Sequence, residues 1–273
     1  MVLRPLLAEG FGYQGEASAF RDGAERGDPS VHLPAAAFIS FLQNHDQVGN
    51  RALGERIGQL AAREPLQTAI VCWLLAPAPP MLFMGEEFNA STPFLYFCDF
   101  GPELGEAVKR GRREEFARFE RFANAEMRET IPDPTRPDTF ERSKLDWDQA
   151  RAPNEWLDLY RRCLLLRHQY LMPHLAQQPA SGAFTVDDER LLAVDWTLGG
   201  GVALHLRANF LGEPSARMQR PRGLSLYDAE SRGAPWRIRL LISDREEAGA
   251  LERARRLGIE TRVVPVSGRS PED

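Results

Sequence analysis

The chain has 273 residues, and its 43% hydrophobic content supplies enough apolar side chains for one large domain or two smaller ones. Its 34 basic and 39 acidic residues give a formal net charge of -5, which provides no electrostatic basis for binding nucleic acid or an anionic membrane. The three cysteines, Cys72, Cys98 and Cys163, are far apart and odd in number, so neither a disulfide framework nor a metal knuckle is expected. These features predict a globular cytoplasmic protein with no metal, no cofactor and no nucleic-acid partner.

Neither a secretory leader nor a membrane helix is expected. Residues 1–7 hold one arginine and a short apolar run, but Glu9 and Gly10 follow at once and no small-residue cleavage site closes the run. The longest apolar stretch, residues 69–84, is interrupted by three prolines that a membrane helix would hardly carry together.

The first ordered elements are expected to alternate between strand and helix. Residues 1–34 have scattered glycines and no sustained period, which predicts mainly loop. The apolar run Ala35–Leu42 ends abruptly in the polar string Gln43–Asp46, as in a buried parallel strand that delivers side chains at its C-terminal end. Residues 64–75 predict a buried helix, and Pro80–Met84 predict a second strand, closed by a glycine and two glutamates. This order is typical of the βα repeat of parallel sheets and barrels.

A helical segment is predicted next. Residues 104–123 are dense in Lys, Arg and Glu with periodic phenylalanines, which predicts an amphipathic surface helix. Residues 131–137 hold three prolines and predict a loop, and residues 154–167 return to helical periodicity.

From Gly182 the pattern changes to short alternating or β-branched runs between turn residues, which predicts a small antiparallel β domain. Its expected strands cover residues 184–186, 191–196, 202–206 and 224–227. Farther on, residues 237–242, 246–257 and 261–266 predict a strand, a helix and a strand, a short βαβ tail. We therefore expect an α/β protein with domains at residues 1–178, 179–235 and 236–273.

The sequence FLQNHDQVGNR at residues 41–51 resembles the fourth conserved region of the α-amylase superfamily, where a barrel strand ends in Asn-His-Asp. Residues 79–100 and 103–116 resemble the trehalohydrolase subgroup more closely than amylases in general, and GFGYQGE at residues 10–16 also fits. The resemblance covers roughly residues 3–228. It implies that the two expected strands are the last two of a (β/α)8 TIM barrel, followed by a C-terminal β domain.

In that subgroup, the resemblance implies, a retaining mechanism cleaves an α-1,4 bond and releases trehalose from maltooligosyltrehalose. The chemistry requires a nucleophile and a general acid about 5 to 5.5 Å apart, while hydrogen bonds to sugar hydroxyls strengthen in the transition state. Asp46 matches the third carboxylate, which stabilises that transition state. His45 matches a neighbour that binds sugar hydroxyls, since a neutral imidazole both donates and accepts, and Asn44 is expected to orient the pair.

Plainer interpretations stay open for these residues. Asn44, His45 and Asp46 could form only a polar turn after a strand. Glu86 is a further candidate for substrate binding, but acidic residues after a strand also cap the next helix or hold a loop.

The nucleophilic Asp and the acidic Glu of the superfamily lie at the ends of earlier barrel strands, and this chain begins only shortly before the strand that carries Asp46. We therefore expect a truncated hydrolase that is inactive alone, and a separate N-terminal half is a possible partner. A noncatalytic carbohydrate-binding or partner-binding module is one alternative. Another is a fragment of phosphoribosylglycinamide formyltransferase, which residues 237–266 resemble, although they lack that enzyme's glycine-rich phosphate loop and its catalytic Asn and His.

Overall fold

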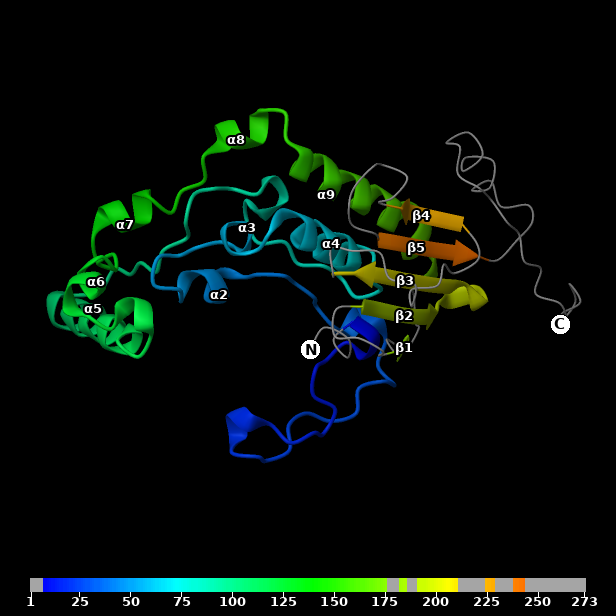
Figure 1. Ribbon diagram of the computed structural model, residues 1–273, viewed down its shortest axis with the longest axis horizontal. Helices are drawn as coiled ribbons and strands as arrows, with labels where there is room; N and C mark the ends of the chain where they lie inside the picture. Colours follow the sequence, from blue (N-terminus) through cyan, green and yellow to red (C-terminus); the bar gives the residue numbers. More distant parts are fainter. Residues whose placement is uncertain (1–6, 176–181, 186–190, 211–223, 229–237, 244–273) are drawn as a thin grey trace, which may run out of the picture. The chain divides into compact units, whose positions relative to one another are not determined.

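The computed structural model describes residues 7–175, 182–185, 191–210, 224–228 and 238–243 (Figure 1). The chain divides into two compact units, which are described separately. The sheet unit comprises residues 1–40, 67–81 and 161–273, and the helical unit comprises residues 41–66 and 82–160. The expected domain boundaries after residues 178 and 235 remain predictions.

The sheet unit contains five antiparallel strands that lie side by side in the order β1-β2-β3-β5-β4 (Figure 1). The predicted antiparallel β segment is thereby confirmed. Cross-strand pairs such as Val194 with Leu206 and Trp196 with Leu204 are buried together, which gives the sheet one apolar face. The strands are β1 (Gly182–Thr185), β2 (Leu191–Thr197), β3 (Ala203–Asn209), β4 (Leu224–Asp228) and β5 (Ile238–Ser243).

Strand β5 corrects one expectation from the sequence. The run at residues 237–242 was expected to start a separate βαβ tail, but β5 pairs antiparallel with both β3 and β4. An apolar strand gains backbone hydrogen bonds on both sides when it inserts between two strands, and it removes an unpaired edge. The helix and strand expected at residues 246–257 and 261–266 lie outside the described residues.

The expected strands at residues 35–42 and 80–84 are reduced to a single parallel bridge, between Ser40 and Pro80. Its two hydrogen bonds run from Ser40 N to Pro79 O at 3.0 Å and from Met81 N to Ser40 O at 2.8 Å. The parallel neighbour relation was right, but the strand lengths were wrong. The three alanines that open the run, strong helix formers, make the 3₁₀ turn η2 (Ala35–Ala37), and the adjacent prolines have no N–H to extend a ladder. Ile39 is 66% exposed, so it is no core strand residue here.

Two long helices match their predictions, α4 (Arg63–Leu74) and α9 (Glu155–Leu166). Within the sheet unit, α9 continues into the π-helical turn η5 (Arg167–Leu171) and the 3₁₀ turn η6 (Met172–His174). The buried guanidinium of Arg167 donates to the carbonyl of Leu74, the last residue of α4, at 3.1 Å. It also donates to the carbonyls of the segment that follows, those of Pro77 at 2.9 Å, Ala78 at 3.0 Å and Ala76. It therefore satisfies acceptors that a helix end leaves open. Burial lowers the pKa of Arg167 to about 10.

The helical unit consists of short helices joined by ordered loops. The helix expected at residues 104–123 ends at Phe116, because the chain turns there to place Phe116 and Phe122 in a small core with Ala52 and Ile131. The elements of this unit are α2 (His45–Gly49), α3 (Ile57–Leu60), η3 (Glu86–Phe88), α5 (Pro102–Phe116), η4 (Glu120–Phe122), α6 (Ala125–Glu129), α7 (Pro137–Glu141) and α8 (Trp147–Arg151). The sheet unit adds the 3₁₀ turns η1 (Ala19–Arg21) and η7 (Gly199–Gly201) and a helical turn at residues 7–9.

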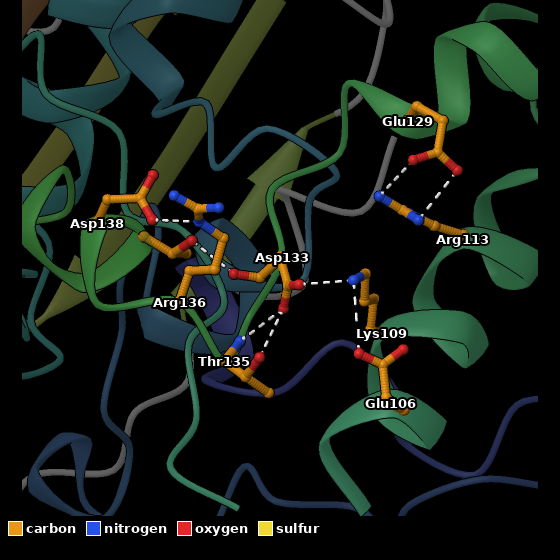
Figure 2. A network of polar contacts seen from close by, with 9 residues as sticks. Glu106, Lys109, Arg113, Glu129, Asp133, Thr135, Arg136 and Asp138 are labelled. Atoms are coloured by element: carbon orange, nitrogen blue, oxygen red, sulfur yellow. Dashed lines mark hydrogen bonds and ion pairs between the residues drawn. The ribbon is translucent and has the colours of Figure 1, made fainter. Parts of the chain in front are cut away.

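Polar contacts brace the loop between α6 and α7, as Figure 2 shows. The Asp133 carboxylate accepts from Lys109 Nζ at 2.8 Å and from the backbone and hydroxyl of Thr135 at 3.0 and 2.8 Å. Desolvation alone would raise the pKa of Asp133, but these donors outweigh it and hold the pKa at about 2. The predicted loop at residues 131–137 is thus confirmed and is fixed to α5 by an ion pair.

Candidate functional site

Asn44 caps helix α2, which carries the two exposed candidate residues. Its side-chain oxygen accepts from Gln47 N at 2.8 Å, and its backbone is extended, as an N-cap requires. The carboxylate of Asp46 lies in the first turn, where the helix dipole favours a negative charge. The polar string predicted after a strand is therefore a helix start.

His45 and Asp46 are open to solvent at the start of α2. Both side chains are 71% exposed, and His45 Nε2 lies 3.4 Å from Asp46 Oδ1. An exposed pair of this kind offers a carboxylate acceptor beside a ring that can both donate and accept, which is the polar chemistry needed to bind neighbouring hydroxyls. The structure brings together three predicted site residues, Asn44, His45 and Asp46.

Glu86 lies in a different environment from this pair. It opens η3 after Gly85, whose φ of 85° is in the left-handed region, and only 5% of Glu86 is exposed. Its Oε1 accepts from the hydroxyl of Tyr160 at 3.3 Å. Burial raises the pKa of Glu86 to about 7, against hydrogen bonds from Phe83, Gln43 and Tyr160 that lower it. The sequence made Glu86 a candidate for binding substrate. In the structure, protein groups surround its carboxyl. Contact between Glu86 and a sugar remains a prediction.

Gln43 and Arg56 are buried polar residues near Glu86 that sequence reasoning did not single out. Gln43 is 4% exposed, and its side-chain Oε1 accepts from Ile57 N at 3.1 Å, while its amide helps to lower the pKa of Glu86. Arg56 is 2% exposed and donates from Nε to Thr92 O at 2.7 Å and from Nη1 to Met84 O at 2.8 Å. Burial lowers the pKa of Arg56, and the nearby carboxylates of Glu86 and Glu87 oppose that shift. The only sequence signal for Gln43 was its position directly after an apolar run. Nothing in the sequence pattern distinguished Arg56 from a surface arginine.

Other kinds of site have less support among the residues that the structure describes. No group of three His, Cys, Asp or Glu side chains gathers there to hold a metal ion. An apolar pocket of about 500 Å³ lies in the sheet unit between Pro77, Pro80, Leu164 and Met172, and none of the predicted site residues lines it. Across the described part of the chain, no helix has the length and apolar character needed to cross a membrane.

The fold is similar to part of a solved structure of the α-amylase type. The chain is similar to the crystal structure of a candidate alpha amylase from Salmonella typhimurium, with 37% identity and a TM-score of 0.77. The match covers 88% of this chain and 41% of that one. No family model matches the chain.

Relatives in sequence identify the particular protein that the segment resembles, malto-oligosyltrehalose trehalohydrolase. The proteins of that name from Brevibacterium helvolum and Rhizobium sp. are 42% identical over 181 residues and 40% identical over 221 residues. The protein from Deinococcus radiodurans is 40% identical over 175 residues. These matches cover 64%, 78% and 63% of this chain but only 29%, 35% and 28% of the relatives, so the chain spans about a third of their length. The resemblance stated from the sequence is confirmed.

Proposed function

We propose that this chain is the part of a trehalohydrolase-type glycoside hydrolase that carries the transition-state-stabilising carboxylate, Asp46. The observation that carries the proposal is the exposed His45–Asp46 pair on a helix capped by Asn44, within a segment about 40% identical to trehalohydrolases. Hydroxyls of a maltooligosaccharide-type substrate meet His45 and Asp46, and Asn44 fixes the direction of both side chains. Residues 35–84 correspond to the last strands of a (β/α)8 barrel in this proposal.

The remaining catalytic groups lie in the portion of the relatives that this segment does not span. Retaining hydrolysis needs a nucleophile and a general acid on either side of the bond, and a third carboxylate adds to the rate only where those two act. Activity of the segment therefore requires an N-terminal portion, either on the same polypeptide or as a separate chain. The three free thiols, Cys72, Cys98 and Cys163, favour a reducing compartment, so we expect the cytosol.

Sugar binding by the full chain tests this function. Maltotriose and trehalose are added to the ¹⁵N-labelled chain, and we expect amide shifts centred on residues 44–47. The double variant His45→Ala/Asp46→Ala should lose these shifts, and Arg110→Met, at an exposed ion pair on α5, should keep them. Binding that persists without His45 and Asp46 would contradict the assigned site. Binding with no hydrolysis in any combination with an N-terminal portion would favour a carbohydrate-binding module instead.

A further inference from the structure

Gln43 links the exposed turn to the buried interior of the helical unit. It directly precedes Asn44, the cap of α2, and its side chain is buried. Its Oε1 accepts from Ile57 N at 3.1 Å, and its amide is close enough to Glu86 to help lower the pKa of that carboxyl. A cap residue holds its orientation only if the backbone before it is fixed. The position of His45 and Asp46 therefore depends on what holds Gln43.

The groups around Glu86 form a buried polar cluster in the same unit. Tyr160 donates to one carboxyl oxygen of Glu86, and Arg56 fixes both ends of the segment 84–92 that carries Glu86, through the carbonyls of Met84 and Thr92. The guanidinium of Arg56 also lies 5.1 Å from the centre of the Phe83 ring. Oε2 of Glu86 and Nη2 of Arg56 are buried and have no hydrogen-bond partner among the described residues. Leaving buried polar atoms without a hydrogen bond costs free energy. A change in the charge of Glu86 is therefore expected to rearrange the hydrogen bonds of this cluster.

We propose that Gln43, Glu86 and Arg56 are positioning residues, which hold the Asn44–Asp46 turn against the segment 84–92 and transmit the protonation state of Glu86 to Asp46. The physical link is the Gln43 amide. An ionised Glu86 can only accept from that amide, whereas a protonated Glu86 can donate and has less acceptor capacity. A change of partner at Gln43 moves the backbone on which Asn44 caps α2. The consequence for hydrolysis rests on the proposed function, but the coupling between Glu86 and the turn does not.

The carboxyl of Glu86 is suited to this role near neutral pH. Its pKa of about 7 arises from burial, and the neighbouring Glu87 carboxylate raises it further. The titratable and charged groups that face it are Arg56, Glu87 and Tyr160, and of these Arg56 stays protonated throughout the neutral range. His45 Nε2 lies 3.4 Å from Asp46 Oδ1, so the His45 side chain is replaced in the measurement.

An NMR titration of the ¹⁵N-labelled full chain in a His45→Gln background tests the coupling without any sugar. We expect the amide resonances of Asp46 and Gln47 to move with a midpoint near pH 7. Glu86→Gln should abolish this movement. Gln43→Met, which keeps the volume but removes the hydrogen bond from Ile57 N and the amide beside Glu86, should abolish it at Asp46 while the amide of Phe88 in η3 continues to titrate.

Glu87→Gln is the matched control, since it removes the adjacent carboxylate and should retain the transition at a slightly lower midpoint. The inference is overturned if the Asp46 and Gln47 resonances titrate unchanged in Glu86→Gln, or if Gln43→Met leaves their transition in place. Because no sugar is present, a negative result here leaves the sugar-binding test of the proposed function unaffected, and loss of sugar binding leaves this test unaffected.

Discussion

The hydroxyl of Tyr160 donates to Oε1 of Glu86 across 3.3 Å, which joins helix α9 to the 3₁₀ turn η3 inside the helical unit. This contact stabilises the ionised form of Glu86, but the burial of the carboxyl has the larger effect, and its pKa lies near 7. Glu86 is therefore partly protonated at neutral pH.

The free energy of unfolding should fall as pH rises from 4.5 to about 7, the range set by the two pKa values of Glu86. Between its ordinary pKa of 4.5 and its folded value of about 7, the folded state holds a proton that the unfolded chain has released. The neutral carboxyl contributes fully to the free energy of unfolding below pH 4.5, and this contribution is lost as pH approaches 7. The free energy of unfolding should change by an amount on the order of 3 kcal/mol. Glu86→Gln should remove this decline. Urea unfolding of both proteins across this range checks it, and a difference between them that does not vary with pH would contradict the folded pKa.

Arg167 should be among the costliest positions to change in the sheet unit. Arg167→Met leaves the carbonyls beyond α4 without donors, so we expect a loss of about 3 kcal/mol in the free energy of unfolding. Arg167→Lys should recover only part, because an ammonium lacks the planar fork that reaches several carbonyls. Arg110→Met is the control and should change stability little, because the Arg110 side chain is 72% exposed. Denaturant unfolding at pH 7 measures all three, and equal effects at 110 and 167 would contradict the assigned role.

Asn44→Ala should reduce both stability and sugar binding, whereas Asn44→Ser should restore much of both. Loss of an N-cap costs about 1 kcal/mol, and an uncapped α2 no longer fixes His45 and Asp46. The helical unit offers a matched control in Asn124, whose side chain caps α6 by accepting from Met127 N at 2.7 Å. Asn124→Ala should cost similar stability and leave sugar-induced amide shifts unchanged. If both variants affect binding equally, the effect reports only general destabilisation.

The brace at Asp133 should matter at low pH. Its folded pKa of about 2 is below the ordinary 3.8, so its contribution is present above pH 3.8 and is lost as pH falls toward 2. Asp133→Asn should make the helical unit unfold at a higher pH during acid titration. High salt should weaken the effect only in part, because the side chains of Lys109 and Asp133 are only 25% and 15% exposed. Circular dichroism during acid titration measures this, and an unchanged acid midpoint would contradict the brace.

The sequence predicted the elements whose pattern reflects local preference. Helices α4 and α9 and strands β1 to β4 follow from apolar periodicity, and Asn44, His45 and Asp46 follow from a motif. What it could not predict depended on partners distant in the chain. The segment 35–42 has apolar residues suited to a strand, but only Ser40 finds a backbone partner, because prolines stand opposite it.

The burial of Glu86 and Arg56 was equally beyond local pattern, because charged residues usually lie on the surface unless a specific set of partners encloses them. The segment of β5 was expected to be a strand, but its place between β3 and β4 depends on partners distant in the chain, which its own pattern does not indicate.

Trehalose release by a reconstituted enzyme tests the central claim most directly. The chain is mixed with the separately expressed N-terminal portion of the Rhizobium relative, which carries the nucleophile and the acid in our account, and the product is measured from a defined maltooligosyltrehalose. We predict no release by either piece alone, release by the mixture, and a fall on the order of a hundredfold or more with Asp46→Asn, since that change removes a charge that acts in the transition state. Turnover by this chain alone, or an active mixture that is indifferent to Asp46→Asn, would contradict the account.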